Sequence, residues 1–110
     1  MILDQAQMGQ ILVAREGGCV LGMVNLLYTV STALGGRVAW LEDVIVLPRL
    51  RGRGVGRALV QAALDHAQAC GCRRVTLLTD ADNGRAQHLY RSLGLVPSAM
   101  QVMRLLCRDD

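Results

Sequence analysis

The sequence of 110 residues contains no lysine and no phenylalanine, so all twelve of its basic side chains are arginines. The missing lysine excludes the phosphate-binding loop of the nucleoside triphosphatases, because that motif ends in Gly-Lys-Ser or Gly-Lys-Thr. Aromatic residues make up only 3% of the chain, which disfavours a nucleic-acid-binding domain that stacks bases on aromatic rings. A net charge of +3 fits a small polyanionic ligand better.

No apolar run reaches the roughly 18 residues of a membrane-spanning helix. The start of the chain, Met1-Ile2-Leu3-Asp4, lacks the basic and apolar regions of a signal peptide. We therefore expect a cytoplasmic protein. The length, with 52% hydrophobic and 19% charged residues, predicts a single globular domain over residues 1–110.

Metal-ligand spacings are also missing. The four cysteines and two histidines match no usual zinc-ligand set. We expect no metal site and four reduced, buried thiols. These six residues are Cys19, Cys70, Cys72, Cys107, His66 and His88.

The first half of the chain is patterned for strands. Apolar and β-branched residues predict strands at 10–15, 19–32 and 37–46. Gly17-Gly18 and Gly35-Gly36 lie between them as turn signals, so the three strands should form an antiparallel meander.

The second half is patterned for alternating helices and strands. The apolar residues of 55–70 recur at helical spacing, which predicts a helix there. Gly71 suits the position just past the end of that helix. A strand is predicted at 73–79, parallel to 37–46 because a crossover helix separates the two. A helix at 85–93 and a last strand at 96–107, interrupted by Pro97, complete a mixed α/β sheet of order β-β-β-α-β-α-β.

The segment 44–59 is the most informative stretch of the chain. A buried strand stops at Pro48, and a segment with glycines at 52, 54 and 56 and arginines at 51, 53 and 57 leads into a helix. Glycines let a backbone approach a ligand, and the first turn of a helix offers unpaired N–H groups, so this junction predicts an anion site. The alternative is a flexible, solvated loop, which the mutual repulsion of the arginines disfavours. The dinucleotide fingerprint fails, because its third glycine would fall on Arg57 or Leu59.

Two motifs resemble those of the GNAT superfamily of N-acetyltransferases, and they occur in the same order as in that family. Arg51-x-x-Gly54-x-Gly56 is similar to the coenzyme-A loop of that family. Residues 83–95, Asn-Gly-Arg-Ala-Gln-His-Leu-Tyr-Arg-Ser-Leu-Gly-Leu, are similar to its Asn-x-x-Ala-x-x-Leu-Tyr-x-x-x-Gly-Phe run and depart only at Leu95. The resemblance covers about residues 10–107. It implies an acyl-CoA N-acyltransferase-like fold and transfer of an acetyl group from acetyl-CoA to an amine by direct attack.

The resemblance also implies roles for individual residues. Tyr90 would protonate the leaving thiolate as general acid, in keeping with an ordinary phenol pKa near 10. Without the resemblance, Tyr90 would be a core tyrosine and Asn83 a helix cap. The residues implied to bind the coenzyme are Val44, Ile45, Val46, Arg51, Gly52, Arg53, Gly54, Val55, Gly56, Arg57, Asn83 and Tyr90.

A carboxylate would take the proton from the attacking amine. Glu42 and Asp43 precede the strand end, and at most one of them faces the substrate because adjacent strand residues point to opposite sides. We favour Glu42, while Asp80 and Asp82 are weaker candidates. The alternative for Glu42 and Asp43 is a solvated or salt-bridged carboxylate.

The sequence departs from the family at its start. Members usually begin with a strand and two helices that form one wall of the acceptor pocket, whereas the meander here begins near residue 10. We expect these N-terminal helices to be absent and the uncovered apolar sheet to favour a homodimer. The alternative function is a catalytically silent module that binds coenzyme A.

Overall fold

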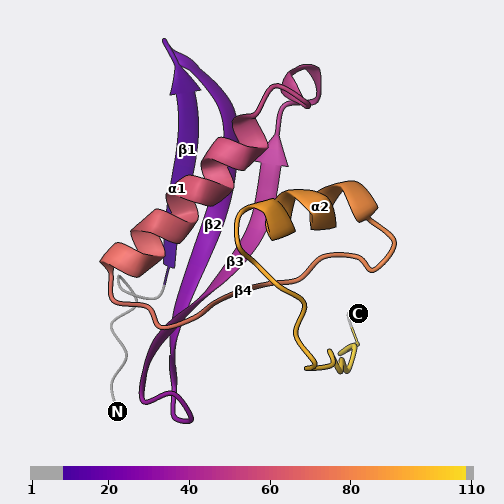
Figure 1. Ribbon diagram of the computed structural model, residues 1–110. Coiled ribbons are helices and arrows are strands. Elements are labelled where there is room, and N and C mark those ends of the chain that lie inside the picture. Colours follow the sequence, from indigo (N-terminus) through magenta and orange to yellow (C-terminus); the bar gives the residue numbers. More distant parts are fainter. Residues whose placement is uncertain (1–8, 109–110) are drawn as a thin grey trace. The chain divides into compact units, whose positions relative to one another are not determined.

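Figure 1 shows the fold as a computed structural model, which describes residues 9–108. The chain divides into two compact units, Met1–Asp80 and Ala81–Asp110. Each unit is described by itself below.

The first unit contains a four-stranded sheet of order β1-β2-β3-β4. The strands β1 to β3 are antiparallel neighbours, and β4 runs parallel to β3. The predicted meander and the predicted parallel pair are therefore confirmed, although the predicted strand at 73–79 is shorter in the structure. The bounds are β1 (Gly9–Glu16), β2 (Cys19–Ser31), β3 (Gly36–Val46) and β4 (Val75–Leu77).

The helix α1 (Val55–Ala69) packs across one face of β1, β2 and β3 (Figure 1). Its apolar side chains recur every three or four residues and so fall on one side of the helix. On the strands, alternate side chains point toward α1, so they and the apolar side chains of the helix form one buried layer. The fully or almost fully buried side chains of this layer are Val24, Leu26, Ala39, Leu41, Leu59, Val60, Ala63 and Ala67.

The helix ends as the sequence predicts. Gly71 has a φ of 82°, a left-handed conformation that glycine adopts without a steric penalty. The Cys72 N–H then donates to the Ala67 carbonyl at 3.0 Å, and the chain turns into β4.

The second unit contains the helix α2 (Gly84–Ser92). The Asn83 side chain accepts a hydrogen bond from the Ala86 N–H at 3.2 Å, so the predicted helix cap is present. The predicted strand at 96–107 is wrong, because residues 96–108 form no strand. A strand needs a neighbour for its backbone N–H and C=O groups, and this stretch has none in the part of the chain that the structure describes.

The thiol prediction needs a correction as well. All four cysteines are free, but three of them are exposed and Cys72 is only half-buried. Residues 9–108 include no group of three His, Cys, Asp or Glu side chains placed to hold a metal ion. Over the same range, no helix is both long and apolar enough to cross a membrane.

Candidate functional site

The loop after β3 folds back on itself before α1 begins. A short 3-10 turn at Pro48–Leu50 follows the strand, and the Arg53 N–H donates to the Leu50 carbonyl at 3.2 Å. Gly52 and Gly54 have φ values of 84° and 82°, which residues with a Cβ rarely adopt. The two glycines are therefore what allows the chain to turn sharply into the helix.

The N-terminus of α1 offers backbone donors. Gly54 is its N-cap, and the Ala58 N–H makes the first helical hydrogen bond, to the Gly54 carbonyl at 3.0 Å. The N–H groups of Val55 and Gly56 precede that bond and have no carbonyl partner within the helix. A Cβ built on Gly52 or Gly54 would meet no atom within 4 Å, so open space adjoins these donors.

Positive charge surrounds the same place. The arginines of the loop are exposed, and the helix dipole adds a partial positive charge at the N-terminus. Backbone donors, open space and guanidinium groups together have the chemistry to hold a pyrophosphate. The coenzyme-A phosphates implied by the resemblance therefore fit these residues. The arginines are Arg51, Arg53 and Arg57.

One edge of β3 is free beside this loop. The strand β4 pairs with β3 only from Ala39 to Leu41. Residues 42–46 continue β3 without a strand neighbour on that side in the part of the chain that the structure describes. A strand edge of this kind can accept an extended ligand through its N–H and C=O groups. Val44, Ile45 and Val46, which the resemblance assigns to the coenzyme, all lie on it.

A β-bulge interrupts the pairing of β2 with β3 at the start of this stretch. Asn25 lies opposite Glu42, whereas Met23 lies opposite Ile45, so β3 carries one more residue than β2 between these pairs. Asp43 lies in the bulge with a φ of 54°, which costs energy for a residue other than glycine. Bulges and such strained residues occur near active sites, where they redirect side chains and backbone groups.

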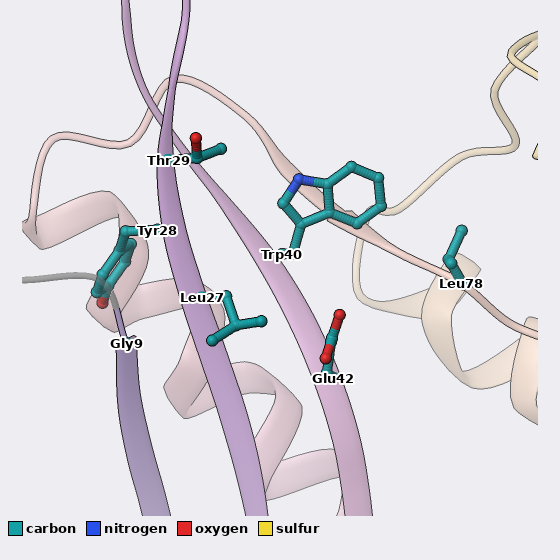
Figure 2. A pocket seen from close by; sticks show the side chains of 7 residues that line it. All are labelled: Gly9, Leu27, Tyr28, Thr29, Trp40, Glu42 and Leu78. Carbon is teal, nitrogen blue, oxygen red and sulfur yellow. The ribbon is translucent and has the colours of Figure 1, made fainter. Parts of the chain in front are cut away.

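A hollow of about 590 Å³ lies beside Glu42 on the sheet. Figure 2 shows the side chains of Trp40 and Glu42 on one side of β3, with Leu27 beside them on β2 and Leu78 across from them. The residues that line the hollow are Gly9, Leu27, Tyr28, Thr29, Trp40, Glu42 and Leu78.

Asn83 and Tyr90 are the other two predicted site residues. Both lie in the second unit, Asn83 as the N-cap of α2 and Tyr90 within the helix. Burial raises the pKa of the half-buried Tyr90 phenol above its ordinary value of 10.0. The phenol therefore carries its proton throughout the neutral range, as a general acid requires.

The sequence reasoning did not find two features of this region. The apolar side of the hollow, formed by Leu27 and Trp40, was not predicted. Trp40 and Glu42 are two residues apart on one strand, so the sequence already implies that they share a face. The strained conformation of Asp43 was missed as well, and nothing in the local sequence signals a bulge there.

Comparison with known proteins identifies the family. Residues 2–95 match the family model described as "Acetyltransferase (GNAT) family". The N-acetyltransferase YhfO of Bacillus subtilis is 37% identical over 84 residues, which cover 76% of this chain and 56% of that protein. The thialysine N-epsilon-acetyltransferase of Bos taurus is 35% identical over 79 residues, covering 72% of this chain and 46% of that protein.

Solved structures agree with the sequence comparisons. A transcriptional regulator from Bacillus halodurans has a TM-score of 0.83 at 28% identity, covering 93% of this chain and 69% of that one. An acetyltransferase of Trypanosoma brucei has a TM-score of 0.77 at 26% identity, covering 93% and 72%.

The mixed sheet, the glycine loop and the crossover helix define an acyl-CoA-dependent N-acyltransferase fold. The chain belongs to the GNAT acetyltransferase family, whose members use acetyl-CoA. It spans about half the length of the curated relatives that it matches.

Proposed function

We propose that this chain transfers the acetyl group of acetyl-CoA to a primary amine by direct attack of the amine on the thioester. One observation carries the proposal. A glycine turn, the donors of a helix N-terminus and a free strand edge follow one another within residues 42–57. The turn and the helix N-terminus can hold a pyrophosphate, and the strand edge can hold the extended pantetheine arm attached to it.

The loop residues would bind the coenzyme's phosphates. The N–H groups from Gly52 to Arg57 would donate to the pyrophosphate oxygens, and the exposed guanidinium groups of Arg51 and Arg53 would neutralise its charge. Gly54 contributes by keeping a side chain out of the space in front of these donors.

The free edge of β3 would bind the pantetheine arm. The backbone groups of Val44, Ile45 and Val46 would pair with its amides as a neighbouring strand would. One of these N–H groups would also donate to the thioester carbonyl and stabilise the negative charge that develops there during attack. Asn83 would contact the arm from the second unit.

Two side chains would move protons. Glu42 would accept a proton from the acceptor ammonium, directly or through a water molecule, so that the nitrogen lone pair can attack the acyl carbon. As the new C–N bond forms and the C–S bond breaks, Tyr90 would donate its phenol proton to the thiolate. Burial supports this role by keeping that phenol protonated.

A catalytically silent coenzyme-binding module is the second candidate. This module would need only the loop at 51–57 and the edge of β3, and no proton transfer by Glu42 or Tyr90. A transfer assay separates the two candidates. It follows release of the coenzyme thiol with a thiol reagent, and the gain of an acetyl group by mass spectrometry of the amine.

We expect thiol release and amine acetylation in equal amounts, and loss of both in Arg53→Glu. Coenzyme binding without any transfer, over a broad panel of primary amines, would contradict the enzyme and favour the silent module.

Three expectations accompany this proposal. The two compact units would work as one acetyltransferase domain, the protein would reside in the cytoplasm, and it would form a homodimer. The dimer rests on exposed apolar side chains of β1, where Ile11 is 57% and Val13 42% exposed. Sedimentation at low micromolar concentration tests it, since a monomer there would exclude it.

A further inference from the structure

The hollow beside Glu42 lies on the face of the sheet opposite the core. Leu26 and Leu41 are buried on the face that packs with α1. Leu27 and Trp40, each one position away along its strand, must therefore point to the other face. These two residues are cross-strand partners, so their side chains form a continuous apolar wall.

Among the lining residues that the structure describes, Glu42 alone carries a charge. No hydrogen-bond or ion-pair partner is found for the Glu42 carboxylate within residues 9–108. Figure 2 shows this carboxylate on the same side of β3 as the Trp40 indole, next to the apolar wall. A negative charge beside an aromatic face is an arrangement that attracts a cation.

The hollow also adjoins the proposed reaction centre. Glu42 borders the hollow and immediately precedes the bulge, and Val44 begins the stretch of β3 that we assign to the coenzyme arm. A ligand in the hollow with its polar end at Glu42 would thus lie next to the thioester.

We propose that the acceptor is a primary amine with a single positive charge on an apolar stem. Its stem lies against Leu27 and Trp40, and its ammonium group lies between the Trp40 indole and the Glu42 carboxylate. The inference rests on the proposed function, because the same Glu42 takes the ammonium proton before transfer.

This assignment excludes other classes of amine. A phosphate or carboxylate on the acceptor would be repelled by Glu42 and would find no cationic partner among the described lining residues. The distant charges of a polyamine would have to lie against leucine side chains, where a charge without a partner is costly. An uncharged alcohol of the same shape keeps the apolar contact but loses the attraction to Glu42.

The protein has a built-in probe, because Trp40 is its only tryptophan. Hexylamine, hexan-1-ol and spermidine do not absorb where tryptophan is excited, so each can be titrated while Trp40 emission is followed. We expect a saturable change with hexylamine at a concentration about tenfold lower than with hexan-1-ol or spermidine.

Variants assign the binding to the hollow. Glu42→Gln keeps the shape and removes the charge, so most of the preference for hexylamine over hexan-1-ol should be lost, and only the attraction of the Trp40 indole for the ammonium remains. Glu16→Gln, at the exposed end of β1, is the matched control and should keep the tenfold preference. Equal binding of the amine and the alcohol by the unmodified protein, or an undiminished preference in Glu42→Gln, would overturn the inference.

A transfer assay with the same amines separates this inference from the proposed function. If hexylamine binds as expected but is never acetylated in the presence of acetyl-CoA, the proposed function fails while the ligand class of the hollow stands. If spermidine or an acidic amine is acetylated faster than hexylamine, the enzyme stands and the assigned acceptor class is wrong.

Discussion

Gly22 of β2 lies so close to Ile45 of β3 that a Cβ on Gly22 would be 2.6 Å from the Ile45 carbonyl oxygen. The same Cβ would be 2.9 Å from Cδ1 of Leu59 on α1. Both distances are shorter than van der Waals contact allows. The close approach of β2 to the Ile45 carbonyl of β3 and to Leu59 of α1 therefore requires glycine at position 22.

Replacing this glycine should disturb both the fold and the edge of β3 that we propose binds the coenzyme. We expect Gly22→Ala to lower the free energy of unfolding by about 1–3 kcal/mol, the usual cost of overpacking, and to weaken acetyl-CoA binding because Ile45 must move. Denaturant unfolding and calorimetric titration measure the two effects. Gly18→Ala is the control, because a Cβ there meets nothing within 4 Å. Equal stability of the two variants would contradict the close packing.

Gly54 and Gly71 provide a matched pair at the two ends of α1. Both have a φ of 82° and open space where a Cβ would stand. Each change to alanine should therefore cost about 1–2 kcal/mol of stability from left-handed strain alone. Only Gly54→Ala places a methyl group before the proposed phosphate donors, so only it should weaken acetyl-CoA binding, by about tenfold or more. Similar affinities of both variants for acetyl-CoA would contradict the proposed phosphate site at residues 51–57.

Tyr28 should make stability depend on alkaline pH. Burial, with a smaller effect from Cys70, raises the pKa of the Tyr28 phenol from 10.0 to about 12. Between these values the unfolded chain has lost the phenol proton and the folded chain keeps it. The contribution of Tyr28 to the free energy of unfolding is therefore constant below pH 10 and falls as pH rises toward 12.

The measurement is denaturant unfolding at a series of pH values on either side of 10. Tyr28→Phe should flatten the decline, apart from the parts due to Tyr90 and Cys72, whose pKa values are also raised. A stability that rises over this interval, or an identical decline in the variant, would show that the Tyr28 phenol is not protected in the folded state.

Much of the local structure in both units could be predicted from the printed sequence. Glycine pairs mark the turns of the meander, and the helical period at 55–70 reproduces α1 to within one residue. The Asn83 cap was predictable because a side-chain oxygen at that position can accept from an N–H of the first turn. Such features depend on neighbours in the chain, which a sequence displays directly.

What could not be predicted depends on partners distant in the chain. The stretch 96–107 has strand-like composition, yet Val96, Met103 and Leu105 are each more than 80% exposed, because composition does not supply a neighbouring strand. The bulge at Asp43 arises from a mismatch in register between β2 and β3. Neither strand reveals that mismatch alone.

Tyr90→Phe should separate binding from chemistry. Removing the hydroxyl takes away the proposed proton donor without changing the shape of the side chain. We expect kcat to fall by about a hundredfold or more while acetyl-CoA affinity stays within about twofold, because the variant keeps the ring that would contact the coenzyme. Unchanged turnover would show that another group, or water, protonates the thiolate.

Thermal unfolding with and without acetyl-CoA tests the coenzyme site most directly. At about 100 times the dissociation constant a ligand adds roughly 2.7 kcal/mol, which for a domain of this size is a rise of roughly ten degrees in Tm. We predict that rise for the unmodified chain and none for Arg53→Glu. No rise at millimolar acetyl-CoA, or an equal rise in Arg53→Glu, would contradict the assignment of residues 51–57 to the coenzyme.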